Sequence, residues 1–197
     1  MSVDERIPQY RRRSIRLRHH DYRREGAYLV TICAYEHTSI FGSIANGQVR
    51  LSNAGQIVRE CWCEIPLHFR HVTLDRFVVM PDHMHGIVVI RSASANTCVE
   101  RGDAIPRRFG GALRDSLGTI VGVFKSYATK RIIEREGNRH VWQRNYYETI
   151  IRDDRHLNAA RRYIILNPKR WHDHVRRNPL GQRNTSGQGN TSGHRNT

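Results

Sequence analysis

The strongest structural signal in the sequence is TLDRFVVMPDHMHGIVVI, residues 73–90. It consists of two runs rich in β-branched and other apolar residues, 73–79 and 84–90, on either side of residues 80–82. Runs of this composition favour β-strands, and a Pro-Asp pair between them is typical of a turn. We therefore predict two neighbouring strands joined by a tight connection.

Before this stretch, the sequence predicts a central strand and a hairpin. Residues 27–33 are β-branched and nearly all apolar, as in a strand that is covered on both faces. Two shorter runs, 40–44 and 48–51, flank Asn46-Gly47, a pair that suits the positive φ values of a tight turn. These segments extend the predicted sheet structure toward the N-terminus.

Two helices are predicted from capping residues and apolar periodicity. Ser52 or Asn53 can cap a helix that runs to about residue 68, with apolar residues at four-residue spacing. A longer helix begins near Ser116, carries one apolar stripe, and can end at Gly137. Each helix has an apolar face to bury against a sheet.

The C-terminal part adds a strand over residues 141–151 and a last helix that starts at Asp153 or Asp154. Pro168 is expected to end this helix, because proline has no N–H to donate. The order strand, hairpin, helix, two strands, helix, strand, helix predicts an α+β sandwich, a mainly antiparallel sheet with helices packed on it. Ferredoxin-like topology is one arrangement of this kind, and the pattern alone does not single it out.

Chain length predicts one domain with tails, since 197 residues leave little room for two full domains. We expect a basic arm over residues 1–25, a compact domain over 26–175, and a disordered tail over 176–197. The tail is rich in Gly, Asn, Ser and Thr and lacks apolar residues to bury. The polar stretch 91–110 is a candidate for a mobile loop near substrate.

The charge of the chain points to a polyanionic partner. Lys and Arg number 33 against 18 Asp and Glu, a formal charge of +15. Phosphate backbones attract such a surface, and binding should weaken as salt rises. No stretch approaches the roughly 20 apolar residues of a membrane-spanning helix, and the N-terminus is too charged for a signal peptide. We therefore expect a cytoplasmic, nucleoid-associated protein without a membrane partner.

Basic side chains mark the candidate nucleic-acid contacts. In the arm they are interleaved with aromatic residues, which can stack on unpaired bases. The side chains expected to contact phosphates are Arg11, Arg12, Arg13, Arg16, Arg18, Lys125, Lys130, Arg161 and Arg162. Most of these charges could equally form a solvated face, so the arm cluster carries more weight than any single residue.

His83-Met84-His85 begins a predicted strand, where residues two apart point to the same face, so both imidazoles can converge on one ion. A His-x-His pair alone is weak support, because the chain has 12 histidines. His172 and His174 form a second such pair, which we place past the last helix and expect to be solvated. The Pro-Asp turn before His83, and Gly86 after the pair, favour a functional role because glycine lets a helix or substrate approach closely.

Tyr163 and Asn167 lie one turn apart on the last predicted helix and therefore share a face. Tyr163 stands at the edge of an apolar stripe. A tyrosine in such a position is ordinarily a packing residue, and an asparagine before a proline is ordinarily a helix terminator. The spacing by itself therefore does not assign chemistry to either residue.

Three motifs in a fixed order favour a catalytic interpretation of these residues over a packing one. They are MPDHMHG at 80–86, WQRNYYE at 142–148 and YIILNP at 163–168. Together they resemble the IS200-type single-strand DNA transposases with a His-hydrophobic-His motif, and most of all the REP-associated tyrosine transposases. The resemblance runs from about Arg16 to Trp171. It implies a ferredoxin-like fold, the His pair on a central strand, and a catalytic domain over residues 26–175.

The resemblance also implies roles for the candidate residues. Tyr163 would be the nucleophile, His83 and His85 the metal ligands, and Asn167 a third ligand or polar support. Insertion-sequence members commonly carry Gln at the position of Asn167, and relatives often carry His where this chain has Thr149. The metal role of Asn167 is therefore the least secure, and none is inherited at Thr149.

Tyr146 and Tyr147 remain rival nucleophiles. Their predicted strand location beside Trp142 suits packing or base stacking better than attack on a phosphate.

The implied reaction is cleavage and strand transfer of hairpin or palindromic single-stranded DNA through a 5′-phosphotyrosine. Mg²⁺ or Mn²⁺ would serve as the ion, Mn²⁺ suiting imidazole better, and Zn²⁺ remains an alternative. Monomer and homodimer both stay open. One rival function is a domesticated, non-catalytic binder of hairpin DNA or RNA. Another is a nucleotide phosphohydrolase, which would carry a third alternating histidine where this chain has Ile87.

Overall fold

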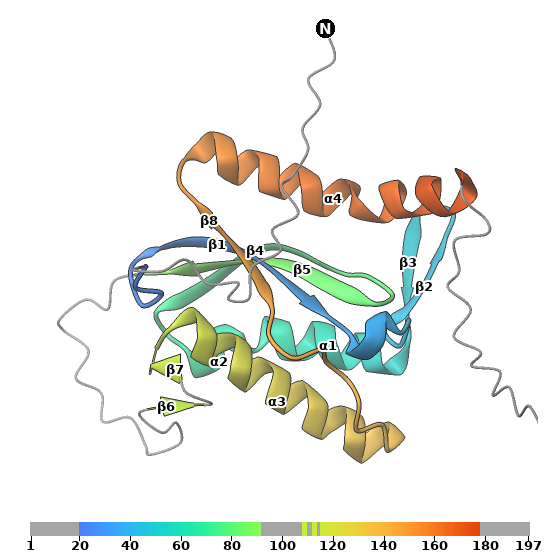
Figure 1. Ribbon diagram of the computed structural model, residues 1–197, viewed down its shortest axis with the longest axis horizontal. Helices are drawn as coiled ribbons and strands as arrows, with labels where there is room; N and C mark the ends of the chain where they lie inside the picture. The colour runs from blue at the N-terminus through green and yellow to red at the C-terminus, as the bar shows by residue number, and fades with distance from the viewer. Residues whose placement is uncertain (1–19, 92–107, 110–111, 114, 178–197) are drawn as a thin grey trace, which may run out of the picture.

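The computed structural model describes residues 20–91, 108–109, 112–113 and 115–177 (Figure 1). Its centre is a four-stranded sheet in the order β4-β5-β1-β8, in which every neighbouring pair is antiparallel. The strands are β1 (Gly26–Cys33), β4 (Val72–Val79), β5 (His83–Ile90) and β8 (Tyr147–Ile151). The predicted antiparallel sheet is confirmed, with the two strands of the histidine stretch at one side of β1.

Helices cover both faces of this sheet (Figure 1). One face carries α1 (Asn53–Cys63) and α3 (Leu117–Glu136), and the other carries α4 (Asp154–Arg177). Without the hairpin, the chain order is β1-α1-β4-β5-α3-β8, and the spatial order β4-β5-β1-β8 makes it ferredoxin-like. The α+β, ferredoxin-like fold class is therefore confirmed, with α4 as an additional layer.

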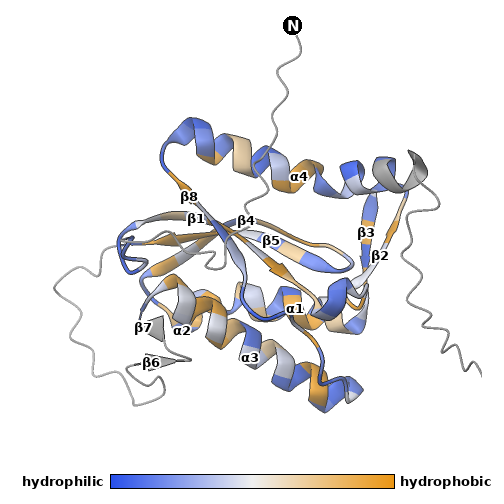
Figure 2. Cartoon of the chain, in the orientation of Figure 1, coloured by the Kyte–Doolittle hydropathy of each residue, from blue (hydrophilic) through white to orange (hydrophobic). Residues whose placement is uncertain are grey.

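The sheet buries apolar side chains on both faces. On β5, Met84 and Val88 belong to the larger core under α1 and α3, whereas Ile87 belongs to a smaller core with Ile164 of α4. Alternate residues of a strand point to opposite faces, so His83 and His85 share the face of Ile87. In Figure 2, α4 is mostly hydrophilic, whereas apolar residues run along the strands.

The predicted hairpin is present as β2 (Gly42–Ala45) and β3 (Gln48–Leu51). Its turn residues have the expected positive φ values, 52° at Asn46 and 72° at Gly47. The hairpin reaches the C-terminal part of α4 (Figure 1), where a Cβ at Gly47 would lie 3.9 Å from the Cα of Lys169. It therefore supports the end of that helix.

The helix caps follow the sequence prediction. The Ser52 hydroxyl accepts from the Gly55 N–H at 3.1 Å, and Ser116 caps α3 in the same way. Gly137 ends α3 with a φ of 71°. The helix predicted to reach residue 68 is divided, because α1 ends at Cys63 and the proline-containing α2 (Ile65–His68) follows.

Three short elements complete the described chain. A 3₁₀ helix, η1 (Tyr35–His37), follows β1, and β6 (Arg108–Phe109) pairs with β7 (Ala112–Leu113). No helix within the described ranges is long and apolar enough to cross a membrane.

Two further predicted boundaries are wrong. The strand expected over 141–151 is confined to β8, because Asn145 has a φ of 69° and Trp142 forms only an isolated bridge to Ala34. Tyr146 consequently precedes the strand. The chain between α3 and β8 is a segment that is hydrogen-bonded to the end of β1 through Gln143 and Cys33.

The second error concerns Pro168, which lies inside α4 instead of ending it. A proline removes one helical hydrogen bond, but contacts made beyond it hold the helix: the Trp171 ring lies 5.5 Å from the His83 ring, and Lys169 lies at the hairpin turn. His172 and His174 are therefore helical and do not follow the last helix; the His172 side chain is 27% exposed.

Several predictions fall outside the described residues. They are the arm up to residue 19 with Arg11, Arg12, Arg13, Arg16 and Arg18, most of the 91–110 stretch, and the tail from residue 178. The domain boundaries at 25 and 175 stay predictions.

Gly86 provides a test of how the two layers of the fold meet. A Cβ added there would lie 2.3 Å from Cζ2 of Trp62, whose side chain is fully buried under the sheet. We expect Gly86→Ala to lower the free energy of unfolding by about 1–3 kcal/mol through overpacking. Urea denaturation measures this. In a double-mutant cycle, Trp62→Phe should relieve part of the added loss, and strictly additive losses would contradict the collision.

Candidate active site

The histidine pair is fixed by the turn that precedes β5. The Ala34 N–H donates to the Asp82 carbonyl at 2.8 Å, and the Met80 N–H donates to the His83 carbonyl at 2.7 Å. These bonds tie the turn to the end of β1 and start β5 at His83. Both imidazoles then project from the face of the sheet that α4 covers.

Each imidazole is oriented through its Nδ1 atom. The His83 Nδ1–H donates to Asp82 Oδ1 at 2.6 Å, and the His85 Nδ1 is hydrogen-bonded to the Thr31 hydroxyl at 2.7 Å. Thr31 is the cross-strand partner of His85 on β1. These bonds occupy the two Nδ1 atoms and leave the two Nε2 atoms close to each other, at a distance of 3.1 Å.

His85 is held in its neutral form. Its side chain is only 5% exposed. Burial, with His83 as a secondary cause, lowers the pKa of His85 to about 3. A neutral imidazole is the form that binds a metal ion.

The two Nε2 atoms fit a shared divalent ion. Two nitrogen ligands at about 2.0–2.1 Å from one ion lie roughly 3 Å apart, which matches the observed separation. Within the described ranges, no group of three or more His, Cys, Asp or Glu side chains could hold a metal. An ion held by the two imidazoles of this pair would have further coordination positions, which water or substrate oxygens could occupy.

Tyr163 of α4 reaches this pair. The helix packs on the sheet through Ile164 and Ala160 against Ile87 and Ile151. This contact places the Tyr163 hydroxyl 3.2 Å from His85 Nε2, with the two rings 4.9 Å apart between centroids. The expected meeting of the phenol with the histidine pair is found within a single chain.

Asn167 lies between Tyr163 and Trp171 along α4 and is 8% exposed. Among the described residues, no hydrogen bond joins its side chain to either histidine. Its position is close to the pair because the residues one turn before and one turn after it both contact the histidine rings. The structure thus puts Asn167 at the site without assigning it a ligand role.

Arg161 anchors α4 to the sheet. Its Nε and Nη2 atoms donate to the two Asp75 carboxylate oxygens at 3.0 and 2.6 Å, and this contact lowers the pKa of Asp75. The ion pair with Asp75 is sufficient to explain the position of the Arg161 side chain, without a bound phosphate. Arg162, the other predicted contact on this helix, is exposed.

Lys125 and Lys130 lie on α3, across the sheet from the histidines. The Lys125 Nζ donates to the carbonyls of Gln143 and Asn145 at 2.6 and 3.0 Å, and burial lowers the pKa of Lys125 to about 8. Lys130 lies 4.0 Å from Glu134. These lysines do not join Tyr163 at the histidine pair.

The rival tyrosines are placed differently from Tyr163. Tyr146 is buried in the core under α1 and α3, on the far face of the sheet. Tyr147 is 51% exposed and pairs with Thr31. It shares the face of His85 but lies two strands away, roughly 10 Å across the sheet.

Sequence reasoning missed three residues that shape the site. Asp82 was assigned only to a turn, although its place beside His83 is a signal for an imidazole partner. Thr31 could be found only from the register of β1 against β5. Trp171 was missed because Pro168 was expected to end the helix before it.

Comparisons with known proteins bear on the fold and the family. No family model matches the chain. An uncharacterized protein of Haemophilus influenzae is 39% identical over 166 residues, which cover 82% of this chain and 91% of that protein. The solved structure of a REP-associated tyrosine transposase bound to a REP hairpin matches 84% of this chain and 74% of its own, with a TM-score of 0.54 and 17% identity. At that identity, the likeness shows the fold.

Proposed function

Since this chain belongs to the same family as the Haemophilus influenzae protein and has the fold of a REP-associated tyrosine transposase, we propose that it cuts and rejoins single-stranded DNA. The observation that carries this proposal is the convergence of the Tyr163 hydroxyl with the Nε2 atoms of His83 and His85. A phenol beside two oriented imidazoles combines a nucleophile with a site for a divalent ion. That combination suits transesterification of a phosphodiester.

In the proposed reaction, the Tyr163 oxygen attacks the phosphorus of the scissile phosphodiester. A bond forms between this oxygen and phosphorus, the bond to the 3′ oxygen breaks, and the departing oxygen takes up a proton. The products are a 5′-phosphotyrosine and a free 3′ hydroxyl. A second 3′ hydroxyl can then attack the phosphotyrosine, which joins the strands and returns the phenol.

Phenols have a reference pKa of about 10 and are mostly protonated at neutral pH. A divalent ion on His83 and His85, Mg²⁺ or Mn²⁺, would polarise the phosphate and stabilise the charge that develops on it. Asn167 would act as a third ligand or as polar support. The helix packing around Ile164 holds the phenol over this position.

Hairpin or palindromic DNA with unpaired flanks is the proposed substrate. The formal charge of +15 suits a polyanion, and the neighbour of the same fold was solved with a REP hairpin. The arginines of the arm, with Lys125, Lys130 and Arg162, are proposed phosphate contacts; Arg161 would contribute only by leaving Asp75. Because Tyr163, His83 and His85 meet within one chain, this arrangement does not require a second copy of the chain.

A labelled hairpin with single-stranded flanks tests the function. Incubated with the protein and Mn²⁺, DNA labelled at its 3′ end should become covalently attached, and DNA labelled at its 5′ end should be released with a 3′ hydroxyl. Denaturing gels separate these species, and EDTA should prevent both. Strand cleavage without any adduct, or an adduct on the 5′-labelled fragment, would contradict the proposal.

The alternative is a non-catalytic binder of hairpin DNA or RNA, and it rests on the same basic charge. It needs no metal ion at His83 and His85, because basic side chains and aromatic rings are sufficient to bind a nucleic acid. Salt-sensitive hairpin binding with no adduct under Mg²⁺, Mn²⁺ or Zn²⁺ would favour this version.

A further inference from the structure

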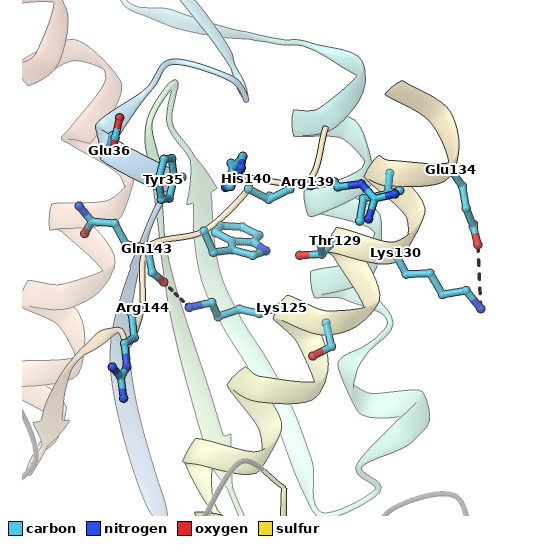
Figure 3. A pocket seen from close by; sticks show the side chains of 14 residues that line it. Tyr35, Glu36, Lys125, Thr129, Lys130, Glu134, Arg139, His140, Gln143 and Arg144 are labelled. Carbon is cyan, nitrogen blue, oxygen red and sulfur yellow. Dashed lines mark hydrogen bonds and ion pairs between the residues drawn. The ribbon is translucent and has the colours of Figure 1, made fainter. Parts of the chain in front are cut away.

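A groove lies on the far side of the sheet from Tyr163, between α3 and the extended segment of residues 139–144 (Figure 3). Its volume is about 950 Å³, near the upper end of the roughly 300–1,000 Å³ that ligand pockets occupy. Tyr35 and Glu36 of η1 form one end of it. The groove belongs to the part of the chain where a regular strand was expected.

The outer wall of the groove is held in place by hydrogen bonds. The Gln143 N–H donates to the Cys33 carbonyl and the Tyr35 N–H donates to the Val141 carbonyl, both at 3.0 Å. The Lys125 ammonium reaches across from α3 to the carbonyls of Gln143 and Asn145. These bonds attach the outer wall both to the end of β1 and to α3.

The lining combines positive charge with aromatic rings. Four basic side chains, Lys125, Lys130, Arg139 and Arg144, face two carboxylates, Glu36 and Glu134. An ammonium has three donors, and the two backbone carbonyls take two of those on Lys125, so the third remains for an incoming anion. Arg139 and Arg144 are exposed at the rim.

Tyr35 and His140 provide a stacking surface. Their rings lie 4.9 Å apart at an interplanar angle of 38°, and both side chains are exposed. Trp142 forms the floor and packs against Phe124 at 5.6 Å between centroids. Exposed rings beside phosphate-binding cations are the features that hold unpaired nucleotides without a requirement for sequence.

The η1 end of the groove lies close in the chain to the end of β1 that pairs with the start of β5. Tyr35 is two residues beyond Cys33, whose cross-strand partner is His83. The His37 imidazole lies 3.8 Å from the Asp82 carboxylate, which also accepts from His83. A strand lying along the groove would therefore leave it at the same end of the sheet as the histidine pair.

We propose that this groove binds the unpaired DNA that flanks the cleaved phosphate, with Arg139, Arg144 and Lys125 contacting phosphates and Tyr35 and His140 stacking on bases. The proposal rests on the proposed function for its choice of DNA. It assigns the groove a separate task, which is to hold the flanking strand while the hairpin is placed elsewhere.

The test measures binding in a Tyr163→Phe background, so that cleavage does not interfere. Two fluorescent DNAs are compared by anisotropy: a blunt hairpin and the same hairpin with a single-stranded flank. We expect Arg139→Ala with Arg144→Ala to weaken binding of the flanked hairpin at least tenfold and to leave the blunt hairpin unchanged. The slope of log K against log salt should fall by about 1.4, from two single-strand phosphate contacts.

Tyr35→Ala provides an independent readout, because it removes stacking and not charge. We expect it to weaken binding of the flanked hairpin by about tenfold with no change in the salt slope. The matched control is Arg59→Ala with Arg70→Ala, two exposed arginines outside the groove, which should not distinguish the two DNAs. Circular dichroism of each variant verifies folding.

The outcomes separate this proposal from the proposed function. Equal losses for blunt and flanked hairpins, or no loss at all, would overturn the groove assignment even if the wild-type protein forms a phosphotyrosine adduct. Selective loss for the flanked hairpin supports the groove even if no adduct forms.

Discussion

Replacing Tyr163 by phenylalanine is expected to abolish the covalent protein–DNA adduct and to lower the rate of cleavage by at least about 1,000-fold, because the substitution removes the attacking oxygen atom. The substitution removes only the hydroxyl, which lies 3.2 Å from His85 Nε2. The ring can keep its contact with the smaller core. Adduct yield on denaturing gels, with 3′-labelled hairpin DNA and Mn²⁺, measures the effect.

Two neighbouring tyrosines provide the controls. Tyr147→Phe removes a hydroxyl from an exposed residue on the same face of the sheet, and Tyr146→Phe removes one from the opposite core. Both variants should form adduct at close to the wild-type level. An adduct that survives Tyr163→Phe and disappears with Tyr147→Phe would transfer the nucleophile to the edge strand and reject the assignment.

Local sequence signals were sufficient to predict most of the strands and the ends of the helices. Apolar runs identified β1, β4 and β5, the Asn46-Gly47 pair identified the hairpin, and Gly137 identified the end of α3. These features depend on a few consecutive residues. Their backbone preferences agree with the final fold, so reading them in isolation introduces little error.

The remaining features depend on contacts that a single segment does not reveal. Pro168 is a reliable helix breaker by propensity, yet the packing of Trp171 on His83 carries α4 past it. The segment before β8 has the composition of a strand, but the positive φ of Asn145 prevents one. The groove could not be predicted for the same reason, because its wall is formed by residues 139–144, which are not part of a regular strand.

The candidate site shows the same division. The His-x-His spacing predicted two imidazoles on one face because strand geometry is local. The choice of Tyr163 as a nucleophile required the resemblance of the chain to a known family, since an amphipathic helix alone gives no reason to prefer a nucleophile over a packing residue. Thr31 required the register of β1 against β5, because its partner His85 lies 54 residues away in sequence.

The histidine pair leads to the second large effect. We expect His83→Ala and His85→Ala each to lower cleavage by at least about 100-fold, because either change removes one of two imidazole donors and leaves an ion poorly held. DNA binding should persist, since neither substitution removes any of the Lys and Arg side chains that give the chain its formal charge of +15. Rates are measured at saturating DNA, and Mn²⁺ binding is followed separately by calorimetry or electron paramagnetic resonance.

His172→Ala is the matched control, because this histidine lies one residue beyond Trp171 on α4 and takes no part in the pair. It should bind Mn²⁺ and cleave DNA as the wild type does. Loss of cleavage in His83→Ala and His85→Ala with unchanged Mn²⁺ affinity would place the ion elsewhere. In that event the 3.1 Å separation of the two Nε2 atoms would reflect packing under α4, and the phenol would need a different source of activation.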